Sequence, residues 1–234
     1  MRVLVIENLK GTHYGQVGVA LAEANAKLDE RRPWNGEALP ETADRHDAIV
    51  VFGGEQSAID DKDHPYLPDV ARLMRLFGEK DKPVLGICLG SQLLARAYGA
   101  TNHIGTAPEF GWREVELRSE AKEDPVLSGL PERFTSFQWH DDTFTLPEGA
   151  TLLASSPVAQ HQCFRIGRAT YGMQFHFEAS REVVERWNVD CADLLRRRHR
   201  EWLAKYPEHA ERHGPAAEAA GLEIARRWVS LIGT

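Results

Sequence analysis

The sequence predicts an α/β fold in which helices flank an open, mostly parallel sheet. Short apolar runs, each typical of a buried strand, occur at Val3–Ile6, Ala48–Phe52 and Pro83–Ile87. Strands of a parallel sheet are buried on both faces, so they appear as continuous apolar runs rather than as alternating patterns. The stretch Tyr66–Phe77 places apolar residues at helical spacing between two of these runs. Strands that alternate with helices are typical of a sheet covered on both sides.

The pattern changes after about residue 110 to one that predicts antiparallel strands. Trp112–Leu117 alternates between apolar and polar residues. Gln160–Ile166 and Ala169–Phe175 are separated by Gly167 and Arg168, which predicts a tight hairpin. We therefore expect this half of the chain to add antiparallel strands to the edge of the parallel sheet.

The chain is expected to be helical from Ser180 onward. Ser180 can cap a helix, because its hydroxyl can accept a hydrogen bond from a free N–H group of the first turn. Proline lacks the N–H that a helix interior needs, so Pro207 and the pair Gly214-Pro215 are expected to interrupt this region. A last helix is expected over about Pro215–Ile232.

No internal repeat, low-complexity linker or clear domain boundary is found in the sequence. We therefore expect residues 1–234 to form one domain, with residues 180–234 as a helical C-terminal extension packed on it. Large aromatic side chains at helical spacing are more often buried than exposed. The tryptophans of the extension are therefore expected to pack on the core, with a docking surface as the alternative. They are Trp187, Trp202 and Trp228.

The composition argues against several classes of protein. With 35 acidic and 28 basic residues the net charge is −7, and no stripe of Lys and Arg is present to neutralise nucleic-acid phosphates. The one basic cluster, Arg196–Arg200, is interpreted as a solvated helix face. No apolar run is long enough to cross a bilayer or to act as a signal peptide. We therefore expect a cytoplasmic protein that binds neither nucleic acid nor a membrane.

The cysteines do not form a pattern that predicts disulfides or a zinc site. They are Cys88, Cys163 and Cys191, an odd number with wide spacing and no C-x-x-C motif. The phosphate-binding motif G-x-x-x-x-G-K-[ST] is also absent from the sequence. We expect neither a metal nor a cofactor.

The segment around Cys88 is the most informative in the chain. A predicted strand ends in G-I-C-L-G, whose central residue is Cys88, and a helical pattern begins directly after it. The flanking glycines allow strand and helix to approach closely around a strained turn, which exposes the central side chain. A helix N-terminus also stabilises the thiolate, the reactive form of cysteine. We interpret Cys88 as a nucleophile; the alternative is a small buried residue whose glycine neighbours supply packing room.

A cysteine nucleophile needs a base, and the base needs a group that orients it. His176 closes an apolar run, and in a strand residues two apart share one side, so Glu178 is expected to hold the imidazole that faces Cys88. The pair Gly53-Gly54 follows another predicted strand, at the edge where open α/β sheets bind ligands. We expect its backbone N–H groups to stabilise an oxyanion, with a simple turn as the alternative.

In combination these motifs resemble the class I (triad) glutamine amidotransferases. The resemblance rests on G-x-C-x-G-x-Q around Cys88, Q-F-H-x-E around His176 and the upstream Gly53-Gly54 pair, and it covers about residues 45–180. It is strongest to the amidotransferase domain of GMP synthase and its stand-alone relatives. The resemblance implies a flavodoxin-like α/β sheet and a cysteine hydrolase that needs no cofactor.

The resemblance also implies a role for each matching residue. Cys88 would attack the γ-carboxamide of glutamine, form a γ-glutamyl thioester and release ammonia. His176 would transfer the protons and Glu178 would orient it. The backbone N–H groups of Gly54 and Leu89 would form the oxyanion hole.

The substrate pocket implied by the resemblance involves two further segments. Gly53 and Gln92 would lie in the glutamine pocket. A loop with Trp139, His140 and Asp141 would contact the amino-acid end of the substrate. The alternative for His140 and Asp141 is a surface turn.

The sequence departs from the pattern of the family at three places. Glu55 follows the glycine pair where many relatives have proline, and Phe177 separates His and Glu where they also have proline. The loop reads Trp139-His-Asp-Asp142, where GMP synthases have Ser-His-Gly-Asp. The third departure bears on the substrate pocket.

These departures leave three hypotheses about function. The first is a glutaminase component that supplies ammonia to a separate synthetase or other acceptor subunit. The second keeps the same catalytic groups but hydrolyses γ-glutamyl peptides or conjugates. The third is an inactive binding or regulatory subunit that retains the fold.

Overall fold

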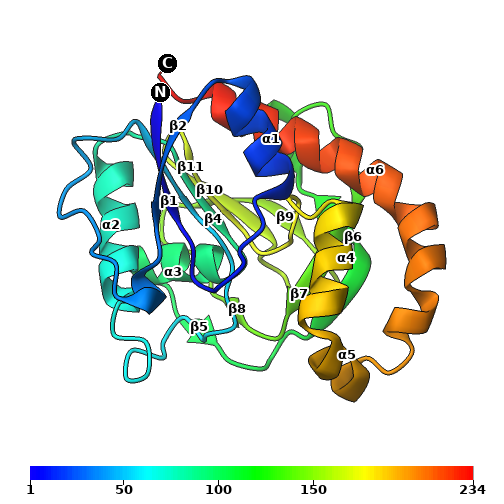
Figure 1. The fold of residues 1–234 in the computed structure, drawn as a ribbon. Helices are drawn as coiled ribbons and strands as arrows, with labels where there is room; N and C mark the ends of the chain where they lie inside the picture. Colours follow the sequence, from blue (N-terminus) through cyan, green and yellow to red (C-terminus); the bar gives the residue numbers. More distant parts are fainter. Residues whose placement is uncertain (234) are drawn as a thin grey trace.

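The computed structural model describes residues 1–233, and its centre is a nine-stranded sheet with the strand order β2-β1-β3-β4-β11-β10-β9-β6-β7 (Figure 1). The part with the order β2-β1-β3-β4-β11 is parallel. Its strands are β1 (Arg2–Ile6), β2 (Lys27–Arg31), β3 (Ala48–Val51), β4 (Val84–Ile87) and β11 (Thr170–Met173). The strands expected from continuous apolar runs are confirmed, and every residue of β3 and β4 is buried.

The other part of the sheet is antiparallel, as the sequence predicts. Its strands are β10 (Cys163–Ile166), β9 (Thr151–Ser155), β6 (Glu109–Leu117) and β7 (Arg133–His140). β10 and β11 form the expected hairpin, whose turn contains Gly167 with φ 58°. Because β11 also pairs in parallel with β4, it joins the two parts of the sheet. A separate small sheet pairs β5 (Asn102–His103) with β8 (Thr143–Phe144).

The edge strand β2 has a sequence that does not predict a strand. Only one of its five residues, Leu28, is apolar. The strand forms because its backbone pairs with β1 along its full length. Ion pairs support the pairing, since the carboxylate of Asp29 lies 2.7 Å from Arg2 and 2.8 Å from Arg31.

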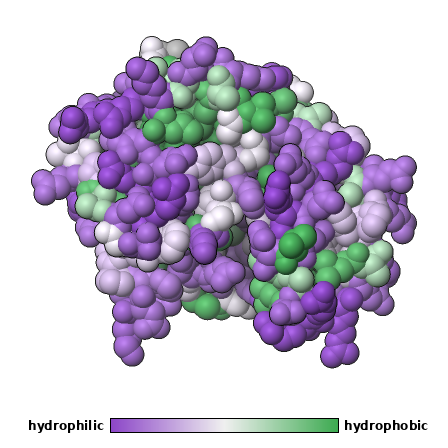
Figure 2. Space-filling view, viewed as in Figure 1, coloured by the Kyte–Doolittle hydropathy of each residue, from purple (hydrophilic) through white to green (hydrophobic). Residues whose placement is uncertain are grey.

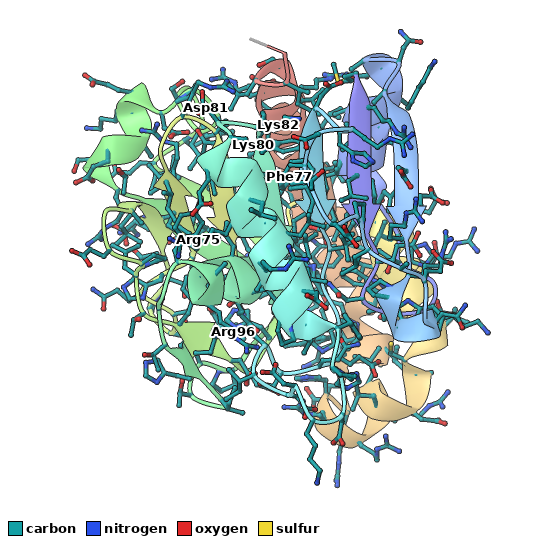
Figure 3. All side chains as sticks on the ribbon, turned by 90° about the vertical axis from the view of Figure 1, so that its left-hand side faces the viewer. Arg75, Phe77, Lys80, Asp81, Lys82 and Arg96 are labelled. Atoms are coloured by element: carbon teal, nitrogen blue, oxygen red, sulfur yellow. The ribbon has the colours of Figure 1, made fainter. Side chains whose placement is uncertain are left out.

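Helices cover both faces of the sheet. Side chains alternate along β1, so successive residues of this strand enter the cores on opposite faces. The covering helices are α1 (Gly15–Glu23), α2 (Leu67–Glu79), α3 (Leu89–Ala97) and α6 (Trp202–Ser230). Leu4 and Ile6 belong to the core beneath α2 and α3, whereas Val3 and Val5 belong to the core beneath α1 and α6. In the view of Figure 3, α2 lies in front of the sheet, with Phe77 fully buried.

The C-terminal region begins as expected at Ser180, whose Oγ accepts a 3.2 Å hydrogen bond from the N–H of Val183. Its first helices are α4 (Arg181–Asp190) and α5 (Ala192–Arg198). The expectation that Pro207 and Gly214-Pro215 interrupt the region is wrong, because both prolines lie inside α6, which is continuous over 29 residues. Thr234, the last residue of the expected extension, lies outside the described residues.

The packing of α6 explains why its prolines do not end it. Each proline removes one backbone donor. The carbonyl group that Pro215 leaves unpaired belongs to Glu211, an exposed residue, so water can satisfy it. Meanwhile Ile224 and Trp228 are fully buried in the core beneath α6 and hold the helix in place.

The face of the molecule that Figure 1 presents has a mostly hydrophilic surface, with smaller hydrophobic areas (Figure 2). The buried residues on the two sides of the sheet form separate apolar clusters. Within residues 1–233, no helix combines the length and the apolar character needed to span a membrane.

Candidate active site

Cys88 lies in the turn between β4 and α3, where the parallel strands end. Its backbone has φ 52° and ψ −110°, a combination that residues other than glycine rarely adopt. The Cys88 N–H donates a 2.8 Å hydrogen bond to the carbonyl oxygen of Met173 on β11. Strained backbone of this kind persists only where the surrounding structure enforces it, and it is common at functional sites. The structure thus contains the strand-to-helix elbow that the sequence predicts.

The glycines on either side of Cys88 allow α3 to approach the sheet. A Cβ atom on Gly86 would collide with the carbonyl oxygen of Gly90. A Cβ atom on Gly90 would collide with the carbonyl oxygen of Val51 on β3. Both obstacles are backbone atoms, so a side chain at either glycine would displace the turn that positions Cys88.

The imidazole of His176 is held by Glu178. Its Nδ1 atom lies 2.7 Å from the carboxylate of Glu178, and both side chains are buried. A carboxylate only accepts, so Nδ1 carries the hydrogen. Nε2 is then the ring nitrogen available to Cys88, and both residues line the same cavity.

The expected strand geometry is not what brings His176 and Glu178 together. β11 ends at Met173, and Phe177 and Glu178 lie in a turn. His176 is instead anchored by an isolated bridge to β7, in which its N–H donates a 2.8 Å hydrogen bond to the carbonyl oxygen of Phe137. The turn that follows carries the carboxylate back to the ring.

The charge of the site favours a protonated His176. Burial by itself lowers the pKa of His176, but the negative charges of Glu178 and Cys88 and its hydrogen bonds to both outweigh burial and raise that pKa to about 10. The imidazolium is therefore the stable form at neutral pH. It can hold a thiolate on one side and a carboxylate on the other.

Gly53 and Gly54 border the same space. A Cβ atom on Gly53 would lie 3.2 Å from Cε1 of His176 and 3.4 Å from Cβ of Cys88, so the lack of a side chain keeps this position open. Within residues 1–233, neither the N–H of Gly54 nor that of Leu89 donates a hydrogen bond. Both residues line the cavity that contains Cys88.

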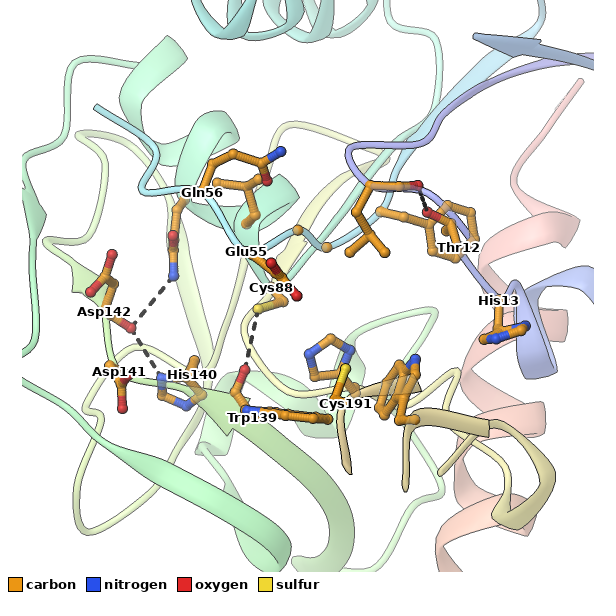
Figure 4. A pocket seen from close by; sticks show the side chains of 18 of the residues that line it. Thr12, His13, Glu55, Gln56, Cys88, Trp139, His140, Asp141, Asp142 and Cys191 are labelled. Carbon is orange, nitrogen blue, oxygen red and sulfur yellow. Dashed lines mark hydrogen bonds between the residues drawn. The ribbon is translucent and has the colours of Figure 1, made fainter. Parts of the chain in front are cut away.

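Gln92 and Trp139 lie beside Cys88 in the cavity. Gln92 is buried, and its Nε2 donates a 3.1 Å hydrogen bond to the side-chain oxygen of Gln174. The carbonyl oxygen of Trp139 lies 3.7 Å from the sulfur of Cys88. A dashed line marks this contact in Figure 4. The Trp139 ring packs edge-on against Trp187 of α4, with 5.8 Å between their centroids.

His140 is not part of a surface turn, because it is almost completely buried. Its Nδ1 donates a 3.0 Å hydrogen bond to the carbonyl oxygen of Asp142, and its Nε2 lies 3.3 Å from the buried carboxylate of Glu109. Both ring nitrogens thus face groups of the protein. We infer that His140 shapes the loop rather than meeting the substrate through its ring.

Asp141 has a charged partner that the sequence did not indicate. Its carboxylate lies 2.7 Å from the Nη2 atom of Arg198 at the end of α5. Arg198 is exposed, as the interpretation of Arg196–Arg200 as a solvated helix face implies, and it also lines the cavity. Its neighbour Arg196 is exposed and pairs with Asp193, as a solvated face implies.

A cavity of about 320 Å³ connects these residues. Cys88 lies near its middle, with Asp141 and Asp142 on one side and Thr12, His13 and Cys191 on the other (Figure 4). Sequence reasoning missed part of its wall: Leu9, Thr12, His13, Glu55, Gln56, Trp187, Cys191, Leu194 and Arg198. Glu55, Trp187, Cys191 and Arg198 had been noted for other reasons, but none of them was assigned to the site. Nothing in the sequence indicates that α4 and α5 border the site, because only the tertiary fold brings these helices over Cys88.

Comparison with known proteins places these observations in a family. The family model for class I glutamine amidotransferases matches residues 13–186. The glutamine amidotransferase-like protein YfeJ of Salmonella typhimurium is 36% identical over 157 residues, which make up 66% of each chain. The chain therefore spans slightly less than two thirds of the length of that protein.

Further relatives carry names that state an activity. One subunit of the glutamine-hydrolysing GMP synthase of Methanoregula boonei is 31% identical over 192 residues, covering 77% of this chain and 96% of the other. γ-Glutamyl peptidase 3 of Arabidopsis thaliana is 30% identical over 192 residues, covering 76% and 74%.

A solved structure agrees with the sequence matches. The crystal structure of a glutamine amidotransferase from Thermotoga maritima superposes with a TM-score of 0.84 at 29% identity, and the match covers 100% of this chain and 98% of the other. The protein therefore belongs to the class I glutamine amidotransferase family, a family of cysteine hydrolases.

Proposed function

We propose that the protein hydrolyses glutamine to glutamate and ammonia and supplies the ammonia to a separate acceptor enzyme. The observation that carries the proposal is the arrangement of Cys88, His176 and Glu178, with a 2.7 Å contact between the last two. An imidazolium next to a cysteine sulfur is the ionic form that a thiol nucleophile requires.

The first half of the proposed reaction transfers the glutamyl group to the enzyme. The Cys88 thiolate attacks the δ-carbonyl carbon of glutamine, and the carbonyl oxygen becomes an oxyanion. The N–H groups of Gly54 and Leu89 donate hydrogen bonds to this oxyanion. His176 then gives its proton to the amide nitrogen, and the carbon–nitrogen bond breaks. Ammonia departs, and a γ-glutamyl thioester remains on Cys88.

The second half releases the product. Neutral His176 removes a proton from water, and the resulting hydroxide attacks the thioester carbon. The carbon–sulfur bond breaks, so glutamate leaves and the Cys88 thiolate is restored beside the imidazolium. Glu178 remains ionised and keeps the hydrogen of His176 on Nδ1 throughout.

An acceptor for the ammonia is part of the proposal because of one relative. The protein from Methanoregula boonei is named as one subunit of a GMP synthase, which indicates that the synthase has a further subunit, and this chain spans 96% of the length of the named one. We expect weak hydrolysis by the protein alone and stimulation when a synthetase partner is present.

A second candidate function is hydrolysis of γ-glutamyl peptides or conjugates. The supporting observation is that the cavity continues beyond Cys88 on the side away from Asp141, towards Thr12, His13 and Cys191. Ammonia does not need this space, whereas a larger amine would. The thioester chemistry is the same, and one relative is named as a γ-glutamyl peptidase.

One assay tests both functions. Glutamate release is measured from L-glutamine and from a set of γ-glutamyl dipeptides, with the Cys88→Ala protein as the control. Glutaminase function predicts a higher kcat/KM for glutamine, and the second function predicts a higher value for a dipeptide. If no substrate is hydrolysed and an electrophilic glutamine analogue fails to label Cys88, both proposals are wrong.

A further inference from the structure

Arg198 is a cation in the cavity, supplied by a part of the chain outside the family match. It is the last residue of α5, whereas the class I amidotransferase model ends at residue 186. Among the cavity-lining residues within 1–233, it is the one lysine or arginine. Its Nη2 atom lies 2.9 Å from Oδ1 and 2.7 Å from Oδ2 of Asp141.

The Arg198–Asp141 pair lies within reach of a substrate bound to Cys88. The Trp139 carbonyl oxygen is 3.7 Å from the sulfur of Cys88, and Asp141 follows two residues later. Two residues of extended chain span at most about 7 Å. In a γ-glutamyl group, two CH₂ groups separate the δ-carbonyl carbon from the α-carbon. The charged groups on the α-carbon of a bound substrate would therefore reach the neighbourhood of this pair.

The two charges of the pair match those of a free α-amino acid. Asp141 alone would attract an α-ammonium group but repel an α-carboxylate. The guanidinium of Arg198 supplies the opposite charge in a planar fork that suits a carboxylate. Its side chain is 47% exposed and that of Asp141 is 39% exposed, so both retain donors or acceptors that the ion pair does not cover, and both residues line the cavity.

We propose that Arg198 binds the α-carboxylate of the γ-glutamyl substrate while Asp141 binds the α-ammonium group. Arg198 is thus a specificity residue, contributed by α5, that selects substrates with an unsubstituted α-amino-acid end. This inference rests on the proposed function, because it takes a γ-glutamyl compound as the substrate.

The test compares two amides that differ at one group. L-Glutamine carries both an α-carboxylate and an ammonium group, whereas 4-aminobutanamide lacks the carboxylate. We expect Arg198→Met to raise KM for glutamine by at least about tenfold, the typical effect of losing a hydrogen bond between charged groups. With 4-aminobutanamide, kcat/KM should stay within about twofold of that of the wild-type protein.

The matched control is Arg196→Met. Arg196 lies on the same helix and also forms an ion pair, with Asp193 at 2.8 Å, but it does not line the cavity. This variant should leave both substrates unaffected. Arg198→Lys keeps the charge without the fork and should recover part of the affinity for glutamine. If Arg198→Met impairs both amides equally, the residue only supports the fold of α5 and the inference is overturned.

The same contact can be measured without turnover. L-Glutamine is titrated calorimetrically into the Cys88→Ala protein and into the Cys88→Ala, Arg198→Met double variant. We expect the Kd to rise at least about tenfold in the double variant. An unchanged Kd overturns the role of Arg198. If the wild-type protein hydrolyses no substrate but glutamine binding still depends on Arg198, the proposed chemistry is wrong and this inference stands.

Discussion

The Nε2 atom of His140 lies 3.3 Å from a carboxylate oxygen of Glu109, and both residues are buried behind the loop that lines the cavity. The same carboxylate accepts hydrogen bonds from Ser156 at 2.8 Å and from Gln162 at 2.6 Å. One buried carboxylate on β6 therefore links the end of β7 to the loop between β9 and β10. It lies directly behind the segment that carries Trp139 and Asp141.

Removal of this carboxylate should destabilise the protein. Glu109→Ala leaves Ser156 and Gln162 without their shared acceptor and removes the carboxylate that faces His140, and we expect a loss of about 3 kcal/mol in the free energy of unfolding. The measurement is urea unfolding at pH 7. The control is Glu114→Ala on the same strand, whose side chain is 61% exposed and pairs with Arg133. That change should cost less than about 1 kcal/mol, and equal losses in the two variants would contradict the role given to Glu109.

Replacement of Cys88 should separate catalysis from stability. Cys88→Ala should abolish hydrolysis and keep the fold, whereas Cys88→Gly should also relieve the strain of φ 52° and ψ −110°. We expect the glycine variant to be about 1 to 3 kcal/mol more stable than the alanine variant. Activity assays and thermal unfolding of both variants provide the check. Wild-type turnover by Cys88→Ala would refute the nucleophile, and equal stabilities would show that the turn is unstrained.

The base should be as necessary as the nucleophile. His176→Asn keeps the size and polarity of the site but cannot transfer protons. We expect kcat/KM for glutamine to fall by about a thousandfold or more. Measured steady-state rates of purified protein decide the question. Near-normal turnover in this variant would eliminate His176 as the base while leaving Cys88 as a candidate.

The raised pKa of His176 predicts a direction for the pH dependence of stability. The folded protein holds a proton on this ring up to a pKa of about 10, above the ordinary value of 6.5. The folded state therefore binds more protons than the unfolded state, and stability falls with rising pH in this interval. The stability advantage of wild type over His176→Asn should be greatest below pH 6.5 and decline towards pH 10. An advantage that grows with pH would contradict this assignment.

We propose that residues 1–234 unfold as one unit, with the C-terminal helices as part of it. Trp228 and Ile224 of α6 are fully buried with residues of β1 and α1, so removal of residues 180–234 would expose the core. We expect tryptophan fluorescence and far-UV circular dichroism to report one coincident urea transition. The truncated chain should fail to fold. Two separate transitions, or a folded truncated chain, would contradict a single domain.

The sequence was sufficient where local pattern and tertiary structure agree. Continuous apolar runs predicted β1, β3 and β4, because short runs rich in valine and isoleucine are typical of strands buried on both faces. The elbow at Cys88 was also predictable from Gly86 and Gly90. Backbone atoms lie so close to these two positions that a Cβ atom at either would collide with them. These features depend on neighbours that are close in the chain or fixed by the sheet.

The sequence was insufficient where distant segments decide the outcome. β2 forms from mostly charged residues because β1 offers a pairing edge, and Pro215 remains inside α6 because the opposite face of that helix is buried. Arg198 carried the same local signal as Arg196, a charge on a short helix. Only the position of α5 over the cavity separates a residue that lines the site from one that faces water.

The charged edge strand has a consequence for how molecules of this protein meet one another. β2 ends the sheet, so within residues 1–233 one side of its backbone has no neighbouring strand, and such an edge is a template for adding a strand from another molecule. Four of its residues are Lys27, Asp29, Glu30 and Arg31. An incoming strand would have to strip water from these charges. The residues that made β2 hard to recognise thus protect the protein from edge-to-edge aggregation.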